Sequence, residues 1–160
     1  MKNKIFESHR LRLHREQTPE GIFSVTKCVQ PKRSVLDEEM RNFVVSSLRF
    51  YVERRDIELR AFVVMPDHVH ILVSLLKEWT LSLWMKCLMS FVSAKTTSRL
   101  RMFGCHWQEG FYDTEVHTEK QFHYLTDYIH DNPVRAGLVV SSEEWSASSA
   151  RSLSWVRLTW

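Results

Sequence analysis

Hydrophobic residues follow a strand pattern in three short stretches of the chain. Residues 23–29 alternate apolar and polar side chains, and residues 59–65 and 69–75 are apolar runs of strand length. Such patterns are typical of β-strands, half-buried where they alternate and buried where they are continuous. Pro66 and Asp67 separate the last two runs with a pair of turn-forming residues, so we expect a β-hairpin there.

Hydrophobic residues follow a helical spacing in other parts of the chain. In residues 36–54 they recur every three or four positions, which predicts an amphipathic helix, and residues 80–100 predict a second one. A Thr–x–x–Gln capping box opens a third predicted helix over residues 118–131. We expect Pro133 to end this helix, because proline disfavours helical backbone at the residue before it.

The remaining segments divide the chain into an arm, one domain and a tail. Residues 1–20 are polar and basic and form a predicted arm, and residues 103–116 are a predicted loop with a short extended piece. The domain covers residues 21–145, and the Ser-rich residues 146–160 form a tail that we expect to be loosely held. The order of the elements predicts an α+β fold of the ferredoxin-like, split βαβ type. We expect an antiparallel sheet with helices on one face, plus a C-terminal helix.

Composition narrows the classes of protein to which the chain can belong. With 160 residues, 44% hydrophobic and 26% charged, it resembles one globular domain. Its net charge of +3 and its pI near 8.8 are compatible with a polyanionic partner. The three cysteines form no C-x-x-C pair, which indicates a reducing cytoplasm, and the four glycines form no phosphate-binding loop. We expect neither a membrane-spanning segment nor a signal peptide.

Two histidines, His68 and His70, stand at the start of the third predicted strand. Side chains two positions apart on a strand point to the same face, so the two imidazoles should lie side by side. Imidazole nitrogens are good ligands for divalent metals, which makes the pair a candidate metal site. The alternative is that both are satisfied core histidines, and the pair alone leaves this open.

A candidate oxygen ligand lies on the third predicted helix. Residues four apart share a helix face, and among the four tyrosines only Tyr128 is followed at that spacing by an amide or carboxylate oxygen, that of Asn132. Phe122, Leu125 and Ile129 lie on another face and can pack against the sheet. The alternative is that Tyr128 is a packing residue, which is the commoner role for an aromatic at helical spacing.

The sequence around these residues resembles a known family of transposases. Residues 63–73 (VVMPDHVHILV) resemble the VMP(N/D)HVH signature of the HUH single-tyrosine transposases. Residues 128–139 (YIHDNPVRAGLV) resemble the second signature of their REP-associated branch. Residues 107–108 (WQ) and 111–113 (FYD) resemble that branch's WQ…(F/Y)(Y/H)D stretch, and residues 145–149 (WSASS) resemble its WPWSS close.

The resemblance implies an enzyme that cleaves and rejoins single-stranded DNA at hairpins of repeated extragenic palindromes (REP). Tyr128 matches the family's nucleophile, which would form a 5′-phosphotyrosine and release a 3′-OH. His68, His70 and Asn132 match the ligands of a divalent cation, Mg²⁺ or Mn²⁺. The resemblance also implies that residues 21–145 are the catalytic domain, that the protein works in the cytoplasm at the nucleoid, and that it is a monomer or a homodimer.

We expect basic and aromatic side chains around the site to hold the DNA. Arg135 follows Asn132 within the matched motif and is the first candidate. Further candidates, each of which also fits ordinary surface charge or core packing, are Arg10, Arg12, Arg15, Lys95, Arg99, Arg101, Trp107 and Tyr112. Two other functions stay open: a catalytically silent single-strand nucleic-acid binding module, and a metal-dependent phosphodiesterase that uses water as its nucleophile.

Overall fold

The strands and helices that the sequence predicts are present in the structure, with ends that shift by a few residues. The structure is a computed structural model that describes residues 21–30, 35–100 and 107–160, and of residues 95–100 it describes the backbone only. The predicted arm over residues 1–20 lies outside the described residues. The elements are β1 (Ile22–Cys28), α1 (Glu38–Glu53), β2 (Ile57–Val64), β3 (His68–Leu75), α2 (Leu81–Leu100), β4 (Tyr112–Val116), α3 (Glu119–Arg135) and two short 3₁₀-helices, η1 (Ser142–Glu144) and η2 (Ser149–Arg151).

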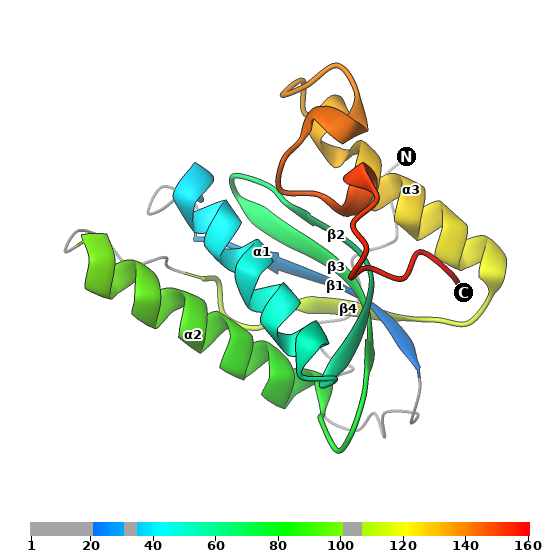
Figure 1. Cartoon of the computed structure of the whole chain (residues 1–160), viewed down its shortest axis with the longest axis horizontal. Coiled ribbons are helices and arrows are strands. Elements are labelled where there is room, and N and C mark those ends of the chain that lie inside the picture. The colour runs from blue at the N-terminus through cyan, green and yellow to red at the C-terminus, as the bar shows by residue number, and fades with distance from the viewer. Residues whose placement is uncertain (1–20, 31–34, 101–106) are drawn as a thin grey trace.

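The strands form one antiparallel sheet in the order β2-β3-β1-β4. β1 lies inside the sheet and pairs with both β3 and β4, whereas β2 lies at an edge. α1 and α2 cover one face of the sheet, and α3 lies on the other face (Figure 1). This is the ferredoxin-like α+β arrangement that the order of elements predicted, with α3 as the additional C-terminal helix.

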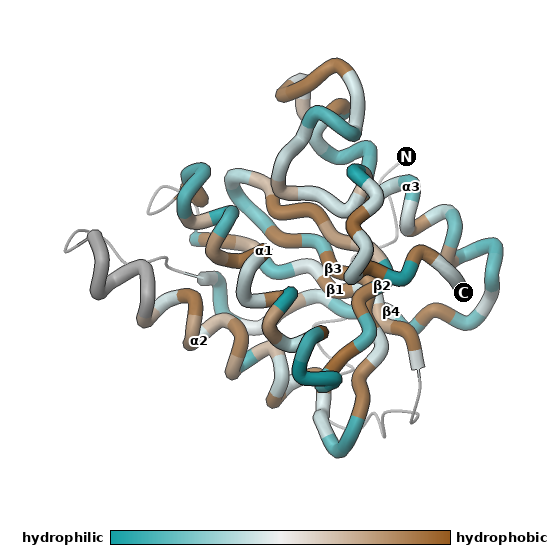
Figure 2. Tube along the Cα trace, viewed as in Figure 1, coloured by the Kyte–Doolittle hydropathy of each residue, from teal (hydrophilic) through white to brown (hydrophobic). Residues whose placement is uncertain are grey.

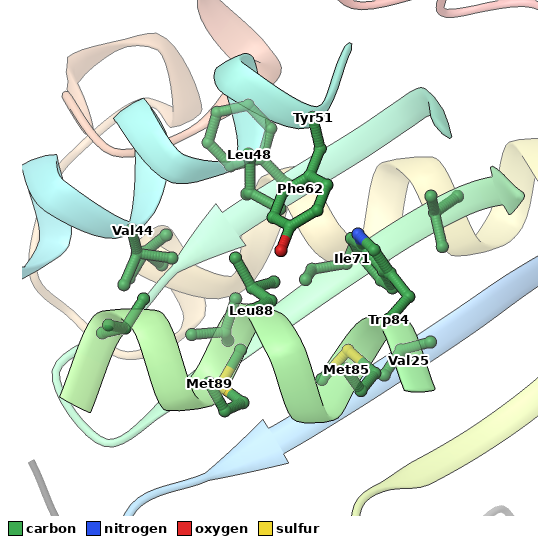
Figure 3. Close-up of a cluster of buried hydrophobic side chains, with 14 of the residues drawn as sticks. Val25, Val44, Leu48, Tyr51, Phe62, Ile71, Trp84, Met85, Leu88 and Met89 are labelled. Atoms are coloured by element: carbon green, nitrogen blue, oxygen red, sulfur yellow. The ribbon is translucent and has the colours of Figure 1, made fainter. Parts of the chain in front are cut away.

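The larger hydrophobic core fills the space between the sheet and the helices α1 and α2 (Figure 3). Trp84 and Leu88 of α2 and Leu48 of α1 are fully buried together with Phe62 and Ile71 of the sheet. Hydrophobic positions run along the strands, and hydrophilic positions gather at the turns (Figure 2). Burial of one such side chain contributes about 1.5–3 kcal/mol, so this layer holds the sheet rigid.

A smaller core joins α3 to the opposite face of the sheet. Phe122 and Ile129 of α3 are buried against Ala61 and Leu72, and Leu125 packs beside them. These three helix residues are the ones that the sequence predicted to face the sheet. Their packing fixes the rotation of α3 about its own axis, and therefore the direction in which its other faces point.

The start of α3 is capped as predicted. The hydroxyl of Thr118 accepts a hydrogen bond from the backbone N–H of Gln121 at 3.2 Å. The amide oxygen of Gln121 in turn accepts the backbone N–H of His117 at 3.0 Å. This reciprocal pair satisfies donors that a helix start leaves unpaired and fixes where the helix begins.

The expectation that Pro133 ends this helix is wrong, because α3 continues to Arg135. Pro133 is buried, and its carbonyl accepts the backbone N–H of Leu138 at 2.9 Å. Proline lacks one N–H donor, but near the end of a helix this costs a single hydrogen bond, and the packing around the ring outweighs it. The longer helix carries Tyr128, Asn132 and Arg135 on one rigid element.

The expectation of a loosely held tail is also wrong, because residues 146–160, which we call the strap, pack along the edge of the sheet. The backbone N–H of Val64 donates to the carbonyl of Ala147 at 2.8 Å, and that of Arg157 donates to the carbonyl of Leu59 at 2.9 Å. An edge strand leaves backbone groups unpaired, and the strap supplies their partners.

Serines are buried in the strap because their hydroxyls satisfy other polar groups. Oγ of Ser149 accepts the backbone N–H of Phe62 at 2.9 Å and lies 2.8 Å from Nε2 of His130. Just before the strap, the indole of Trp145 donates to a β2 carbonyl at 3.0 Å. Within the strap, the ring of Trp155 stacks on that of Phe62 with centroids 5.5 Å apart. The strap therefore contacts both β2 and α3.

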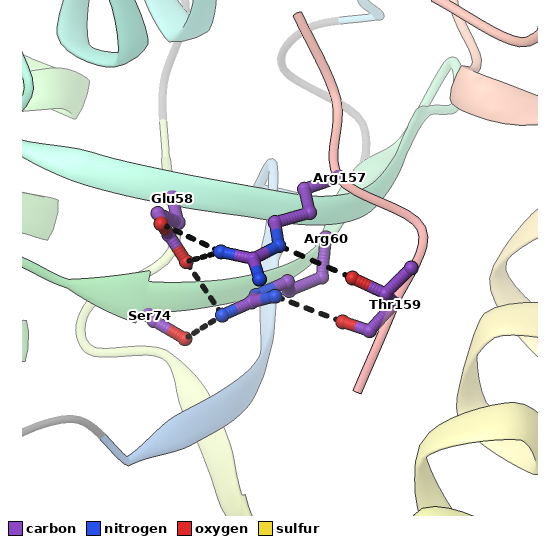
Figure 4. Close-up of polar contacts among 5 residues, drawn as sticks. All are labelled: Glu58, Arg60, Ser74, Arg157 and Thr159. Carbon is purple, nitrogen blue, oxygen red and sulfur yellow. Dashed lines mark hydrogen bonds and ion pairs between the residues drawn. The ribbon is translucent and has the colours of Figure 1, made fainter.

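A group of polar side chains fastens the end of the strap to the sheet (Figure 4). The buried guanidinium of Arg60 donates to the Glu58 carboxylate at 2.6 Å and to the Thr159 carbonyl at 2.8 Å. Arg157 donates to the same carboxylate at 3.2 Å. Burial lowers the pKa of Arg60, and the Glu58 carboxylate opposes that shift. A buried charge without partners is costly, so Arg60 favours the attached strap.

Two expectations from composition can be compared with this fold. Cys28 and Cys87 are free thiols, and Cys105 lies outside the described residues. Over the part of the chain that the structure covers, no helix combines the length and the apolar character needed to cross a membrane.

Candidate active site

His68 and His70 open β3 on the face of the sheet that α3 covers. Their ring centroids are 5.4 Å apart, which confirms that the two imidazoles share a face. On the neighbouring strand β1, Cys28 lies opposite His68 and Thr26 lies opposite His70. The histidine pair therefore stands on a strand that is paired on both sides, with β1 and β2, which is a rigid base for binding.

Each imidazole has a polar neighbour that fixes its orientation. Nδ1 of His68 lies 2.7 Å from Oδ1 of Asp67, and Nε2 of His70 lies 2.9 Å from Oγ1 of Thr26. Burial, with His68 as a second cause, lowers the pKa of His70 to about 3. His70 is therefore neutral at physiological pH, and the neutral imidazole is the form that binds metal ions.

Tyr128 of α3 faces this histidine pair. Its ring centroid lies 5.7 Å from that of His70, and the side chain is half-buried against His70 rather than packed into either core. One turn later, Nδ2 of Asn132 donates to the backbone carbonyl of Tyr128 at 2.9 Å. Because the amide nitrogen is engaged, Oδ1 of Asn132 is the atom left to bind a ligand.

An aromatic ring and a cation accompany Tyr128 on α3. The guanidinium carbon of Arg135 lies 4.8 Å from the centroid of the Tyr128 ring. Tyr124, one turn before Tyr128, stacks on it with centroids 6.5 Å apart and planes 27° apart. Arg135 is exposed, so its charge is available beside the phenol to a phosphate group that approaches from solvent.

Cys28 lies next to His68 and is a second group that could act as a nucleophile. Burial raises the pKa of its thiol, and the Asp67 carboxylate raises it further, whereas Lys27 acts in the opposite direction. The thiol is therefore protonated at neutral pH, and the protonated form is a poor nucleophile.

A divalent cation fits these donors if Asn132 takes part. Among the residues that the structure describes, no group of three or more His, Cys, Asp or Glu side chains could hold a metal ion. Two imidazoles and one amide oxygen leave coordination positions for phosphate and water, which suits Mn²⁺ or Mg²⁺ better than a structural zinc. The contact between Asp67 and His68 is of the kind that orients a metal-binding imidazole.

A hollow of about 350 Å³, counting its open mouth, lies beside the histidine pair. Thr26 forms part of its wall and also bonds His70, so the hollow and the histidine pair share a residue. β1 and the segment that leads into β4 line the hollow with Thr26, Cys28, Gln108, Glu109, Gly110, Phe111 and Tyr112.

The residues predicted to contact DNA fall in different places. Arg135 lies beside Tyr128, and Tyr112 lines the hollow. Trp107 packs against the larger core, which is the packing alternative for this residue. Four of the other candidates lie outside the described residues: Arg10, Arg12, Arg15 and Arg101. Lys95 and Arg99 lie on α2, where the structure describes their backbone only.

Sequence reasoning missed the polar neighbours of the two histidines. Asp67 could have been found, because it directly precedes His68. Thr26 could not, because it is 44 residues from His70 and reaches it only through strand pairing. His130, also on α3, has its Nε2 2.8 Å from Oγ of Ser149, so this imidazole is engaged by the strap.

The chain matches a known family over residues 21–132, which include β1, the histidine pair, Tyr128 and Asn132; the family model is described as "Transposase IS200 like". The chain is 28% identical over 103 residues to the REP-associated tyrosine transposase of Escherichia coli (strain K12), a match that covers 59% of this chain and 55% of that protein. The chain thus spans about half the length of that relative. It is 25% identical over 146 residues to a putative REP-associated tyrosine transposase of Haemophilus influenzae, covering 84% of this chain and 82% of that one.

Two solved structures share the fold. The first is described as a REP-associated tyrosine transposase bound to a REP hairpin, with a TM-score of 0.66, 23% identity, and coverage of 92% of this chain and 88% of that one. The second is a putative transposase from Deinococcus radiodurans R1, with a TM-score of 0.52, 19% identity, and coverage of 74% and 95%. At these identities the two structures support the fold alone. The match over residues 21–132 establishes that this chain belongs to the IS200-like transposase family.

Proposed function

We propose that the protein cleaves and rejoins single-stranded DNA with Tyr128 as its nucleophile. The observation that carries this proposal is the contact between Tyr128 of α3 and His70 of β3, whose ring centroids lie 5.7 Å apart. This contact joins a phenol to a pair of imidazoles that can serve a metal ion. Membership of a transposase family supports the same class of reaction.

In the proposed reaction, Oη of Tyr128 attacks a phosphorus atom of the DNA backbone. The bond from Oη to phosphorus forms while the bond from phosphorus to the 3′ oxygen breaks. The phenol proton passes to solvent, and the released 3′ oxygen takes up a proton. The product is a 5′-phosphotyrosine and a free 3′-OH. Since the link to Tyr128 is itself a phosphodiester, a 3′-OH can attack it and rejoin DNA without a nucleotide cofactor.

The surrounding residues have separate roles in this proposal. His68, His70 and Asn132 would hold a divalent cation, which when bound offsets the charge of the scissile phosphate and orients it. Thr26 keeps the imidazole of His70 in place through its contact of 2.9 Å. The exposed guanidinium of Arg135 would bind a phosphate oxygen beside the phenol.

We infer that the substrate is a DNA hairpin with a single-stranded flank. A structure that shares this fold is described as bound to a REP hairpin, and the positive net charge of the chain suits a nucleic acid. With such a substrate, we expect the protein to act at the nucleoid. Tyr128 contacts His70 of the same chain, so the proposed site requires no second protomer.

The proposal is tested by a covalent-adduct assay. The protein is incubated with labelled, denatured genomic DNA fragments of its source organism and Mn²⁺, and the products are separated on a denaturing gel. We expect a protein–DNA band that depends on the metal ion and maps to Tyr128 by peptide mass. Tyr128→Phe removes one oxygen and should abolish the band. Tyr124→Phe, one turn earlier on the same helix, is the matched control and should retain it.

Two other results would replace this proposal with one of its alternatives. DNA retention under native conditions, with no covalent band in Mg²⁺ or Mn²⁺, would indicate a silent binding module. Cleaved DNA without a covalent band, unchanged in Tyr128→Phe, would indicate a phosphodiesterase that uses water.

A further inference from the structure

We propose that the hollow beside the histidine pair binds one unpaired base of the DNA strand, a base that offers N–H donors to Glu109. This inference rests on the proposed function, because it takes a nucleotide next to the scissile phosphate as the ligand. The hollow is lined by seven residues, from β1 and residues 108–112, an extent that suits one base rather than a duplex.

The position of the hollow links it to the reacting phosphate. Thr26 lines the hollow, and its Oγ1 lies 2.9 Å from Nε2 of His70. Cys28 lines it too and is the strand partner of His68. A phosphate at the histidine pair would therefore lie next to this hollow, and the base of an adjoining nucleotide is the group that can enter it.

The wall formed by residues 108–112 is held rigidly against β1. The ammonium of Lys27 donates to the carbonyls of Gln108 and Gly110. The backbone N–H of Gln108 donates to the carbonyl of Cys28 at 2.9 Å, and its side-chain amide donates to the carbonyl of Val29, directly after β1, at 3.2 Å. Gly110 adopts φ +69°, a conformation that glycine tolerates best. A preformed wall of this kind lowers the entropic cost of binding.

The chemistry of the lining selects a base over a phosphate. Glu109 and the hydroxyl of Thr26 are side-chain oxygens in the wall, and the lining contains no lysine or arginine. A carboxylate repels phosphate but accepts hydrogen bonds from base amino and imino groups. Guanine fits best, because its N1–H and its 2-amino group are adjacent donors for the two carboxylate oxygens. Phe111 packs against the larger core, whereas Tyr112 adds aromatic surface to the wall for stacking.

The experiment uses a DNA hairpin whose single-stranded flanks carry four randomised nucleotides on each side. Binding is selected with Tyr128→Phe, which cannot cleave in the proposed reaction, and covalent capture is selected in parallel with the unchanged chain. We expect one flank position, next to the cleaved bond, to favour guanine in both selections. Inosine at that position lacks the 2-amino group and should weaken binding by about ten-fold.

Glu109→Gln, made in the Tyr128→Phe protein, should remove this sensitivity to inosine and leave an affinity ratio near one. Glu78→Gln, at an exposed turn away from the site, is the matched control and should keep the ten-fold ratio. Circular dichroism of each variant shows that the fold is retained.

The outcomes separate this inference from the proposed function. Covalent capture without any base preference, or inosine sensitivity that survives Glu109→Gln, overturns the base site alone. A base preference that depends on Glu109, in a protein that forms no covalent adduct, overturns the cleavage proposal and leaves the base site standing.

Discussion

Nε2 of His130 in α3 lies 2.8 Å from Oγ of Ser149 in the strap, and the same oxygen accepts the backbone N–H of Phe62 in β2. One hydroxyl thus links the helix that carries Tyr128, the strap and the edge strand. The position of the phenol over the sheet depends on a segment that follows it by some twenty residues.

Replacing Ser149 by alanine should therefore destabilise the protein. Ser149 is fully buried, so the change leaves a buried backbone N–H of Phe62 without its side-chain acceptor, at a cost of about 1–3 kcal/mol. Urea denaturation measures the free energy of unfolding. Ser146→Ala, exposed in the same segment, is the control and should change it by less than about 0.5 kcal/mol. Equal stability of the two variants would contradict the role assigned to the Ser149 hydroxyl.

Asp67→Ala should lower the affinity of the site for the metal ion, so that cleavage needs more Mn²⁺ but is not abolished. The change removes the carboxylate that lies 2.7 Å from Nδ1 of His68, and outer partners of this kind contribute about 10–100-fold to metal affinity. Because Asp67 is exposed, we expect the lower end of this range, about ten-fold. The Mn²⁺ concentration that gives half-maximal adduct formation measures it. An unchanged concentration would argue that Asp67 does not orient His68.

Arg135→Ala should weaken DNA binding in a salt-dependent way. An arginine that neutralises one phosphate contributes about one unit to the slope of log affinity against log salt. Fluorescence anisotropy with a single-stranded probe, in the Tyr128→Phe protein, gives this slope without cleavage. Arg151→Ala removes an exposed arginine of the strap and is the matched control. If both variants keep the original slope, Arg135 does not contact phosphate.

Asp56 should make stability depend on pH in the acid range. Its carboxylate lies 2.6 Å from Nζ of Lys77 and 2.9 Å from Nε of Arg54. The hydrogen bond to Lys77 is the main cause that lowers the pKa of Asp56 below its usual value. Stability from such a group is present above the unfolded pKa, about 3.9, and is lost as pH falls through the lower folded value.

The comparison of the unchanged chain with Asp56→Asn isolates this effect. The difference in their free energies of unfolding should be largest above about pH 4 and should shrink as the pH falls further. Glu53→Gln, which removes an exposed pair with Arg49, should show no comparable trend. A constant difference for Asp56→Asn across this range would show that the carboxylate is not stabilised by its partners.

Short spacings in the sequence predicted the parts of the site that lie on one element. The spacing of His68 and His70 sufficed because strand side chains alternate, and that of Tyr128 and Asn132 because a helix repeats every 3.6 residues. Local spacing does not predict which elements of the fold face each other. The contact between Tyr128 and His70 depends on the packing of Phe122 and Ile129, which the sequence predicted as a face but not as a docking position.

Other features depend on tertiary contacts that no local pattern contains. The composition of the strap predicts a flexible tail, yet Ser148 and Ser149 are buried because they meet the unpaired edge of β2. Pro133 predicts a helix end, yet α3 continues past it because of its packing, and this places Arg135 over the Tyr128 ring. In both cases tertiary packing outweighs the local preference of the residue.

The strap also protects the molecule from aggregation. β2 and the residue that follows it contain the uncharged run AFVVM at residues 61–65, a composition that favours pairing between exposed strands of different molecules. While the strap is attached, its backbone bonds to Leu59 and Val64 occupy that edge. When the strap is displaced, by proteolysis or by mild denaturant, the same edge becomes a template for strand pairing between molecules. We therefore expect that conditions which detach the strap cause aggregation before they unfold the domain.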